Sequence, residues 1–284
     1  MELVSIWLLL YLAIALFVSS IFLEDYSRYL ASAGWVFFGA FWLARLPIYL
    51  DTNSAIKIAL SAASLPASVY VGYLVYQERH DVLLKVSQMV AAMGLVYVPF
   101  EMYGPLNQML IEHTAMQTYR IQTLLGIDVA LQQRQGLENL LVVTNPATGE
   151  RYSTYIILAC TGMGAASMFA GIIAGVEASL TRKMQAMGFA IPVIYVLNLI
   201  RNVFISTAYG YQWFSFGEPT VISLVGGYEG YASFFWADKV ISQSLSVVVL
   251  VGILLVVVRF LPEVMEVIDD VLEVFGVATK SGSS

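Results

Sequence analysis

Runs of about 20 apolar residues recur along this 284-residue chain, and they constrain its fold more than any other feature. A helix of about 20 apolar residues crosses the hydrocarbon core of a bilayer. Only 12% of the residues are charged, whereas soluble domains carry roughly 25%. The sequence therefore predicts an all-α, polytopic transmembrane bundle in the cell membrane. About seven spans are expected by hydropathy, at Leu3–Leu23, Tyr29–Leu50, Ala55–Tyr76, Val82–Glu101, Tyr155–Val176, Met184–Ser206 and Ser233–Val258.

These spans divide the chain into four predicted parts. Residues 1–102 hold four transmembrane helices, and residues 103–154 form a long extracytoplasmic loop. Residues 155–260 form the transmembrane helices that carry the chemistry, and residues 261–284 form a cytoplasmic amphipathic helix and tail. The orientation follows from Arg182 and Lys183, because basic residues in short links favour the cytoplasmic side. This places the long loop and the predicted site outside.

Within the long loop, the pattern is mixed. Ile111–Gln135 is rich in Gln, Thr and Leu and predicts a partly amphipathic helix. Leu140–Val143 and Tyr152–Ile156 are β-prone and flank a turn at Asn145–Gly149, so they favour a short hairpin.

The chain contains a single cysteine, Cys160, in the fifth predicted span. One cysteine excludes an internal disulfide and a cysteine metal cluster. No sequence motif for a metal site or a nucleotide cofactor is present, so neither a metal nor a cofactor is expected. The net charge of −6 argues against a nucleic-acid partner.

As a continuous helix, the fifth span would align Cys160, Gly164, Ser167 and Gly171 on one face of small residues. Such a face lets another helix approach closely. A lone cysteine in an apolar helix is commonly a small buried hydrophobe, so the case for chemistry rests on its neighbours.

Polar residues in the next two spans are expected at the same membrane depth as Cys160. Asn198, Arg201 and Asn202 share one helix face in the sixth span. The outer turns of the seventh span hold a second polar group, which consists of Asp238, Lys239, Ser242 and Gln243. Basic residues are costly inside a membrane. Snorkelling at helix ends explains each one singly, but together these residues favour a polar pocket.

Nucleophilic chemistry suits such a pocket. The thiolate is the reactive form of cysteine, and a nearby cation stabilises it. A guanidinium can also hold the oxyanion that forms when a thiolate attacks an amide carbonyl. Leaving-group protonation is left to Lys239, a tyrosine or water.

At these residues the chain resembles the exosortase/archaeosortase family of membrane cysteine transpeptidases. The resemblance lies in Ala159-Cys160-Thr161-Gly162, in Leu199-Ile200-Arg201-Asn202, and in a third polar element at the start of the following span. It implies that Cys160 is the nucleophile and Arg201 its cationic partner. The third catalytic position in the family is Arg, His or Asn, and the nearest candidate here is Lys239. The remaining candidates, expected to bind substrate, are Asp238, Asn198, Asn202, Ser242 and Gln243.

The resemblance also implies a substrate and a host. The enzyme would cleave a C-terminal tripartite signal of secreted surface proteins, made of a short motif, a transmembrane helix and a basic tail. In the archaeal branch the motif is Pro-Gly-Phe. The new C-terminus would pass, through a thioester, to a membrane lipid, and the host would be an archaeon.

Three other interpretations fit parts of the pattern. A channel or transporter would use the buried polar residues as a permeation path, although no internal repeat is seen. A retinal protein would place its Schiff-base lysine at Lys239, but the third span has no acidic counter-ion. A scaffold of the same fold without catalysis is the third.

Overall fold

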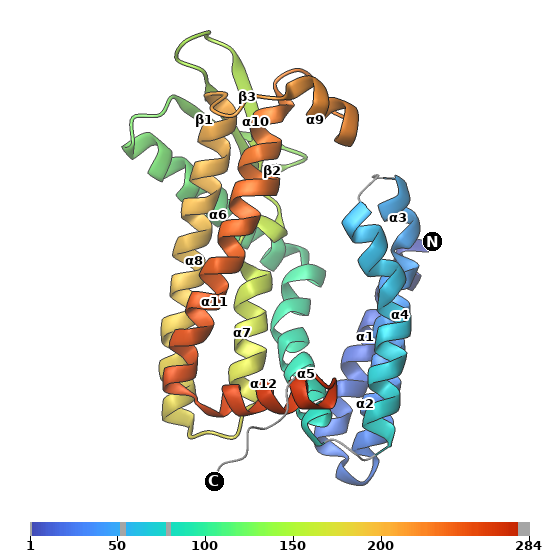
Figure 1. Ribbon diagram of the computed structural model, residues 1–284. Coiled ribbons are helices and arrows are strands. Elements are labelled where there is room, and N and C mark those ends of the chain that lie inside the picture. Colours follow the sequence, from blue (N-terminus) through green and yellow to red (C-terminus); the bar gives the residue numbers. More distant parts are fainter. Residues whose placement is uncertain (1, 52–54, 78–80, 278–284) are drawn as a thin grey trace. The chain divides into compact units, whose positions relative to one another are not determined.

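The computed structural model describes residues 2–51, 55–77 and 81–277. The chain forms two compact units, and both are mainly helical (Figure 1). Five of the described helical segments are long and apolar enough to cross a membrane. They are Glu24–Leu50, Ile58–Tyr76, Asp81–Met102, Leu180–Gly210 and Tyr231–Phe260. Ile6–Phe22 and Met163–Gly175 are shorter apolar helices, so five rather than seven segments have membrane-spanning length.

The first unit comprises residues 1–96, 167–187 and 258–284. Its main elements are α1 (Glu2–Phe22), α2 (Ser27–Ala44), α3 (Leu46–Asp51), α4 (Ala55–Tyr76), part of α5 (Asp81–Met102), most of α7 (Met163–Gly175) and α12 (Glu263–Val274). A short 3-10 turn, η1 (Glu24–Tyr26), joins α1 to α2. Apolar side chains from α2, α4 and α5 form one core, and α1, α2 and α5 form another around Phe17.

The predicted small-residue face of α7 does admit a neighbouring helix. A Cβ atom at Gly171 would lie 2.5 Å from the Met89 carbonyl oxygen, and one at Gly175 would lie 2.3 Å from the Met89 side chain. Only glycine lets α7 pack this closely against α5. The face begins inside α7, however, and does not include Cys160.

The amphipathic helix predicted after Arg259 is present as α12. Glu263 in its first turn forms an ion pair with Arg182 at the start of α8. The tail predicted for residues 279–284 lies outside the described residues.

The second unit comprises residues 97–166 and 188–257. It contains the end of α5, α6 (Gly104–Leu124), strands β1 (Val129–Arg134), β2 (Leu137–Thr144) and β3 (Arg151–Tyr155), and the turn η2 (Leu158–Cys160). It continues with most of α8 (Leu180–Gly210), then α9 (Glu218–Val225), α10 (Tyr231–Phe234), the π-helical segment η3 (Phe235–Ser242) and α11 (Gln243–Phe260).

The three strands form an antiparallel sheet in the order β1-β2-β3, so the all-α prediction is incomplete. Leu141 on β2 packs against Ile111 and Ala115 of α6. Val143 meets the end of α8, where a Cβ at Gly210 would lie 2.3 Å from the Val143 side chain. Figure 1 shows the sheet beside α6 and the end of α8.

The predicted hairpin lies near the observed β2 and β3, whereas β1 differs from the prediction. The predicted helix 111–135 ends at Leu124, and Val129–Arg134 is extended instead. The strand forms because β1 pairs with β2 along its length, across a tight turn at Gln135 and Gly136 whose φ angles are +54° and +86°. The segment between the sixth and seventh predicted spans contains the helix α9.

Candidate active site

Cys160 lies in a turn, not inside a helix as the sequence predicted. Tyr155 ends strand β3, η2 forms a single 3-10 turn that ends at Cys160, and α7 begins only at Met163. The Thr161 hydroxyl donates a hydrogen bond to the Leu158 carbonyl (2.7 Å) and accepts one from the Met163 N–H (3.3 Å). The cysteine therefore lies at the junction between the sheet and the short apolar helix α7.

Gly162 makes this turn possible for two reasons. Its φ angle is +79°, in the left-handed region that residues with a Cβ rarely adopt. A Cβ there would also lie 3.2 Å from the Asn198 Cβ atom. Glycine thus reverses the chain after Cys160 and lets the turn lie directly against α8.

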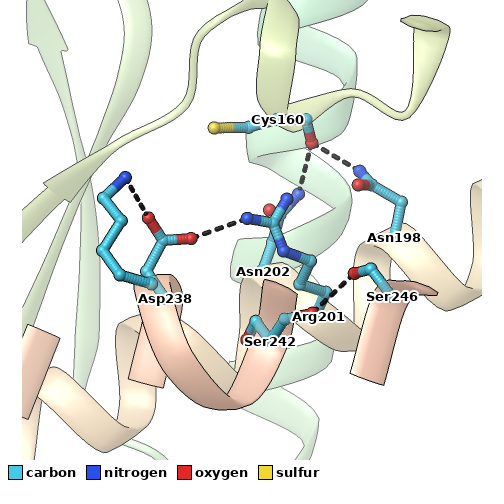
Figure 2. Close-up of polar contacts among 8 residues, drawn as sticks. Cys160, Asn198, Arg201, Asn202, Asp238, Ser242 and Ser246 are labelled. Carbon is cyan, nitrogen blue, oxygen red and sulfur yellow. Dashed lines mark hydrogen bonds and ion pairs between the residues drawn. The ribbon is translucent and has the colours of Figure 1, made fainter. Parts of the chain in front are cut away.

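Two amides of α8 hold the Cys160 main chain. The Asn198 and Asn202 Nδ2 atoms both donate hydrogen bonds to the Cys160 carbonyl oxygen, at 2.8 Å for Asn202 (Figure 2). Asn202 is buried and Asn198 is half-buried. Asn198 and Asn202 lie about one helical turn apart, and together they fix the position of the Cys160 turn along α8.

The three charged candidates form one connected group. Arg201 Nη2 lies 2.6 Å from Asp238 Oδ1 (Figure 2). Lys239 Nζ lies 2.7 Å from Asp238 Oδ2. The Asp238 side chain is 12% exposed, and those of Arg201 and Lys239 are 24% and 47% exposed. Asp238 is therefore shared by both cations, a pairing that the sequence could not reveal.

The π-helical segment η3 determines which side chains face α8. π-helical turns are rare and occur frequently at functional sites. In η3, Asp238 and Ser242 are buried, whereas Lys239 is exposed. Gln243 is exposed at the start of α11 and does not line the cavity described next.

A cavity of about 570 Å³ lies beside Arg201, between the η2–α7 junction and helices α8 and α11. Its walls are mostly apolar, with Phe204, Leu245 and Ile253 among the lining residues, while Asn198, Arg201, Ser242 and Ser246 supply polar groups. Arg201 Nε and Ser242 Oγ are buried and find no hydrogen-bond partner in the described part of the chain. An apolar chamber with unused donors suits an elongated, mainly apolar ligand that carries an oxygen acceptor.

Electrostatics at the thiol act in both directions. Cys160 lies outside the five membrane-length helices, and burial raises the pKa of its thiol, whereas the Arg201 and Lys239 charges lower that pKa and the Asp238 charge raises it. Burial and the Asp238 charge therefore favour the protonated thiol, and the Arg201 guanidinium is already paired with Asp238. On the sheet, burial and the hydrogen bond to Glu150 raise the pKa of Tyr152 to about 12.

Gln122 is a buried residue that sequence reasoning missed. Its Nε2 atom donates to Ser206 Oγ (2.7 Å) and Thr207 Oγ1 (3.0 Å), and Ser206 donates in turn to the Asn202 carbonyl (2.9 Å). Gln122 therefore ties α6 to the part of α8 that carries Asn202. Gln122 lies 84 and 85 residues from its two partners in the chain, so no local sequence pattern predicts this contact.

Comparison with known proteins identifies the class. The family model described as transmembrane exosortase matches residues 4–235, so the chain belongs to this family. The matched range contains Cys160 and Arg201 and ends before Asp238 and Lys239. Membership, together with the apolar helices, makes the chain a multi-pass membrane protein.

Two curated relatives are more particular. The chain is 38% identical to "Archaeosortase A" of Haloferax volcanii over 262 residues, which cover 88% of this chain and 86% of the relative. It is 35% identical to "Archaeosortase A" of Natronomonas pharaonis over 259 residues, or 88% and 81%. No solved structure matches the chain. These relatives support a transpeptidase and do not favour the transporter alternative.

Proposed function

We propose that this protein is a membrane-embedded cysteine transpeptidase that cleaves a C-terminal tripartite sorting signal of secreted surface proteins. By family resemblance the signal consists of a Pro-Gly-Phe-type motif, a transmembrane helix and a basic tail. The new C-terminus passes to a membrane lipid, and the site opens to the extracytoplasmic side. The observation that carries the proposal is the Cys160 turn, held by two amides of α8 beside the Arg201 guanidinium.

The reaction begins when the Cys160 thiol gives its proton to water and the sulfur attacks the carbonyl carbon of the scissile peptide bond. The C–S bond forms as the carbonyl becomes an oxyanion. Arg201 stabilises this charge, because preorganised donors act most strongly where charge develops. When the intermediate collapses, the C–N bond breaks and the amine takes a proton, which leaves a thioester on Cys160.

A nucleophilic group of a membrane lipid then attacks the thioester and releases the Cys160 thiol. Lys239 is the most exposed of the three charged groups and is the proposed third catalytic residue, the one that exchanges protons with the leaving and entering groups. Asn198 and Asn202 act as positioning residues, because their Nδ2 atoms already bond to the Cys160 carbonyl. The neighbouring cavity, with Ser242 in its wall, receives the apolar part of the signal.

The test is processing of a reporter in Haloferax volcanii cells that lack their own archaeosortase A. The reporter ends in Pro-Gly-Phe, an apolar helix and basic residues, and an immunoblot reports its length. We expect the wild-type chain to shorten it and the Cys160→Ala and Cys160→Ser variants to leave it uncut, because neither offers a thiolate.

Ser244, an exposed residue of α11 that does not line the cavity, provides the control substitution. The Ser244→Ala variant should process the reporter normally. Shortened reporter in the Cys160→Ala strain, at normal protein level, would rule out Cys160 as the nucleophile. Mass spectrometry of the shortened reporter tests the second half of the reaction: a lipid on its C-terminus is expected, and a free carboxylate would instead indicate hydrolysis.

A further inference from the structure

The sheet has an open edge at β3. Among the described residues, only those of β2 pair with this strand. The Ile156 N–H donates to the Asn139 carbonyl (2.9 Å), and the Asn145 N–H donates to the Glu150 carbonyl (2.7 Å). Because antiparallel strands alternate between bonded and non-bonded pairs, the even-numbered residues of this segment direct their backbone groups toward β2.

The odd-numbered residues of β3 direct theirs away from the sheet. These are Arg151, Ser153 and Tyr155, and no backbone hydrogen bond to them is found within the described ranges. All three are exposed, and Tyr155 is 48% exposed. A row of unpaired N–H and C=O groups is a template for one more strand.

This edge is regular and held in place. The opposite edge strand, β1, has a register irregularity between Gln132 and Gln133, whereas the pairing of β3 runs without interruption. The buried Asn139 also donates from Nδ2 to the Ile156 carbonyl (2.9 Å). Proteins commonly blunt edge strands with bulges, and β3 lacks this protection.

The edge leads directly to the thiol. After Tyr155, Ile157 is still extended, with φ −121° and ψ 171°, and its side chain is 44% exposed. Cys160 follows within the next turn, where its N–H bonds to the Ile157 carbonyl (2.8 Å). A peptide lying along β3 would therefore be guided toward the sulfur.

We propose that the segment of the polypeptide substrate just before the cleavage site adds to β3 as a fourth strand. The chain belongs to a peptidase and transpeptidase family, so its occupant at this edge is an extended peptide. It runs parallel to β3, because the apolar helix that follows the cleavage site must enter the membrane beyond Cys160. This inference rests on the proposed function, and main-chain bonds would supply much of its affinity.

The first test removes one outward donor. Ser153→Pro deletes the N–H that faces away from β2, and proline is tolerated at such positions of edge strands. In the Cys160→Ala background, which cannot cut, we expect capture of the tripartite reporter to fall about tenfold, as for one or two lost hydrogen bonds. Ser153→Ala, which keeps the backbone donor, should capture the reporter normally. Equal capture by a folded Ser153→Pro variant would overturn the proposal.

The second test changes the reporter instead, so it holds even if Ser153→Pro does not fold. Proline is placed singly at each of the six positions before the motif, and processing by the wild-type chain is measured. A paired strand bonds through every second residue, so losses should alternate along the reporter. Uniform losses or none would overturn strand addition, whereas failure of the proposed function itself would appear as an uncut unmodified reporter.

Discussion

At the scale of single residues, Arg201 contributes the geometry of its N–H donors as well as its charge. One Nη atom is bound by Asp238, while the buried Nε has no hydrogen-bond partner among the residues that the structure describes. A planar guanidinium can hold the carboxylate with one edge and turn another donor to an oxyanion, which a lysine ammonium cannot do. Because different N–H groups of Arg201 would bind Asp238 and the oxyanion, another cation should not replace Arg201.

We therefore expect Arg201→Lys to reduce reporter processing by on the order of 10²-fold or more, comparable to loss of an oxyanion donor. The measurement is the rate of reporter shortening at matched protein level. Near-normal processing by the lysine variant would mean that Arg201 contributes charge alone.

Asp238 determines how strongly the cations act on the thiol. Its carboxylate raises the pKa of Cys160, while Arg201 and Lys239 lower it. Asp238→Asn removes the opposing charge, so the thiol pKa falls and more thiolate is present at neutral pH. Lys239→Gln removes a stabilising cation and shifts the pKa in the other direction.

The check is the rate of Cys160 alkylation by iodoacetamide, a neutral reagent, as a function of pH. Cys160 is the only cysteine, so the label reports one site. We expect faster alkylation at neutral pH in Asp238→Asn and slower alkylation in Lys239→Gln. Identical pH profiles in both variants and the wild type would show that the charges of Asp238 and Lys239 do not affect the Cys160 thiol pKa.

At the scale of elements, the site depends on how η2 turns into α7. Gly162→Ala would force a Cβ onto a left-handed residue and against Asn198, so the turn must shift away from α8. We expect a folded protein with processing reduced at least tenfold, since misplacement of about 1 Å can cost on the order of 10²-fold.

Gly188 offers the control. It is exposed within α8, and a Cβ there would meet no atom within 4 Å. Gly188→Ala should keep normal processing and, because alanine favours helices, normal or higher stability. If both alanine variants behaved alike, the conformation of the η2–α7 turn would not matter to the reaction.

At the scale of the whole molecule, the orientation in the membrane is the open prediction. The division into residues 1–102, 103–154, 155–260 and 261–284 also stays a prediction. The predicted orientation implies that β3 lies outside the cell and that α12 lies inside. Two positions suit a test because both are exposed: Ser153 on β3 and Glu273 on α12.

In a Cys160→Ala background, Ser153→Cys should react with a membrane-impermeant maleimide in intact cells. Glu273→Cys should react only after the cells are lysed. The reverse pattern would invert the topology and place the Cys160 turn on the cytoplasmic side.

The sequence by itself determined the membrane character, the amphipathic helix α12 and the pairing of Cys160 with Arg201 as candidates. Each of these rests on local information: apolar runs, helical spacing of acids, and short motifs. The β-prone segments of the long loop were also visible, because β2 is rich in Leu and Val.

Only the tertiary structure decided the rest, because those features arise from residues far apart in the chain. The fifth predicted span becomes a strand end, a turn and a short helix because Gly162 fits against α8. Arg201 and Asp238 meet across two helices. Such contacts depend on how separate elements pack, and the sequence periodicity of a single element does not predict this packing.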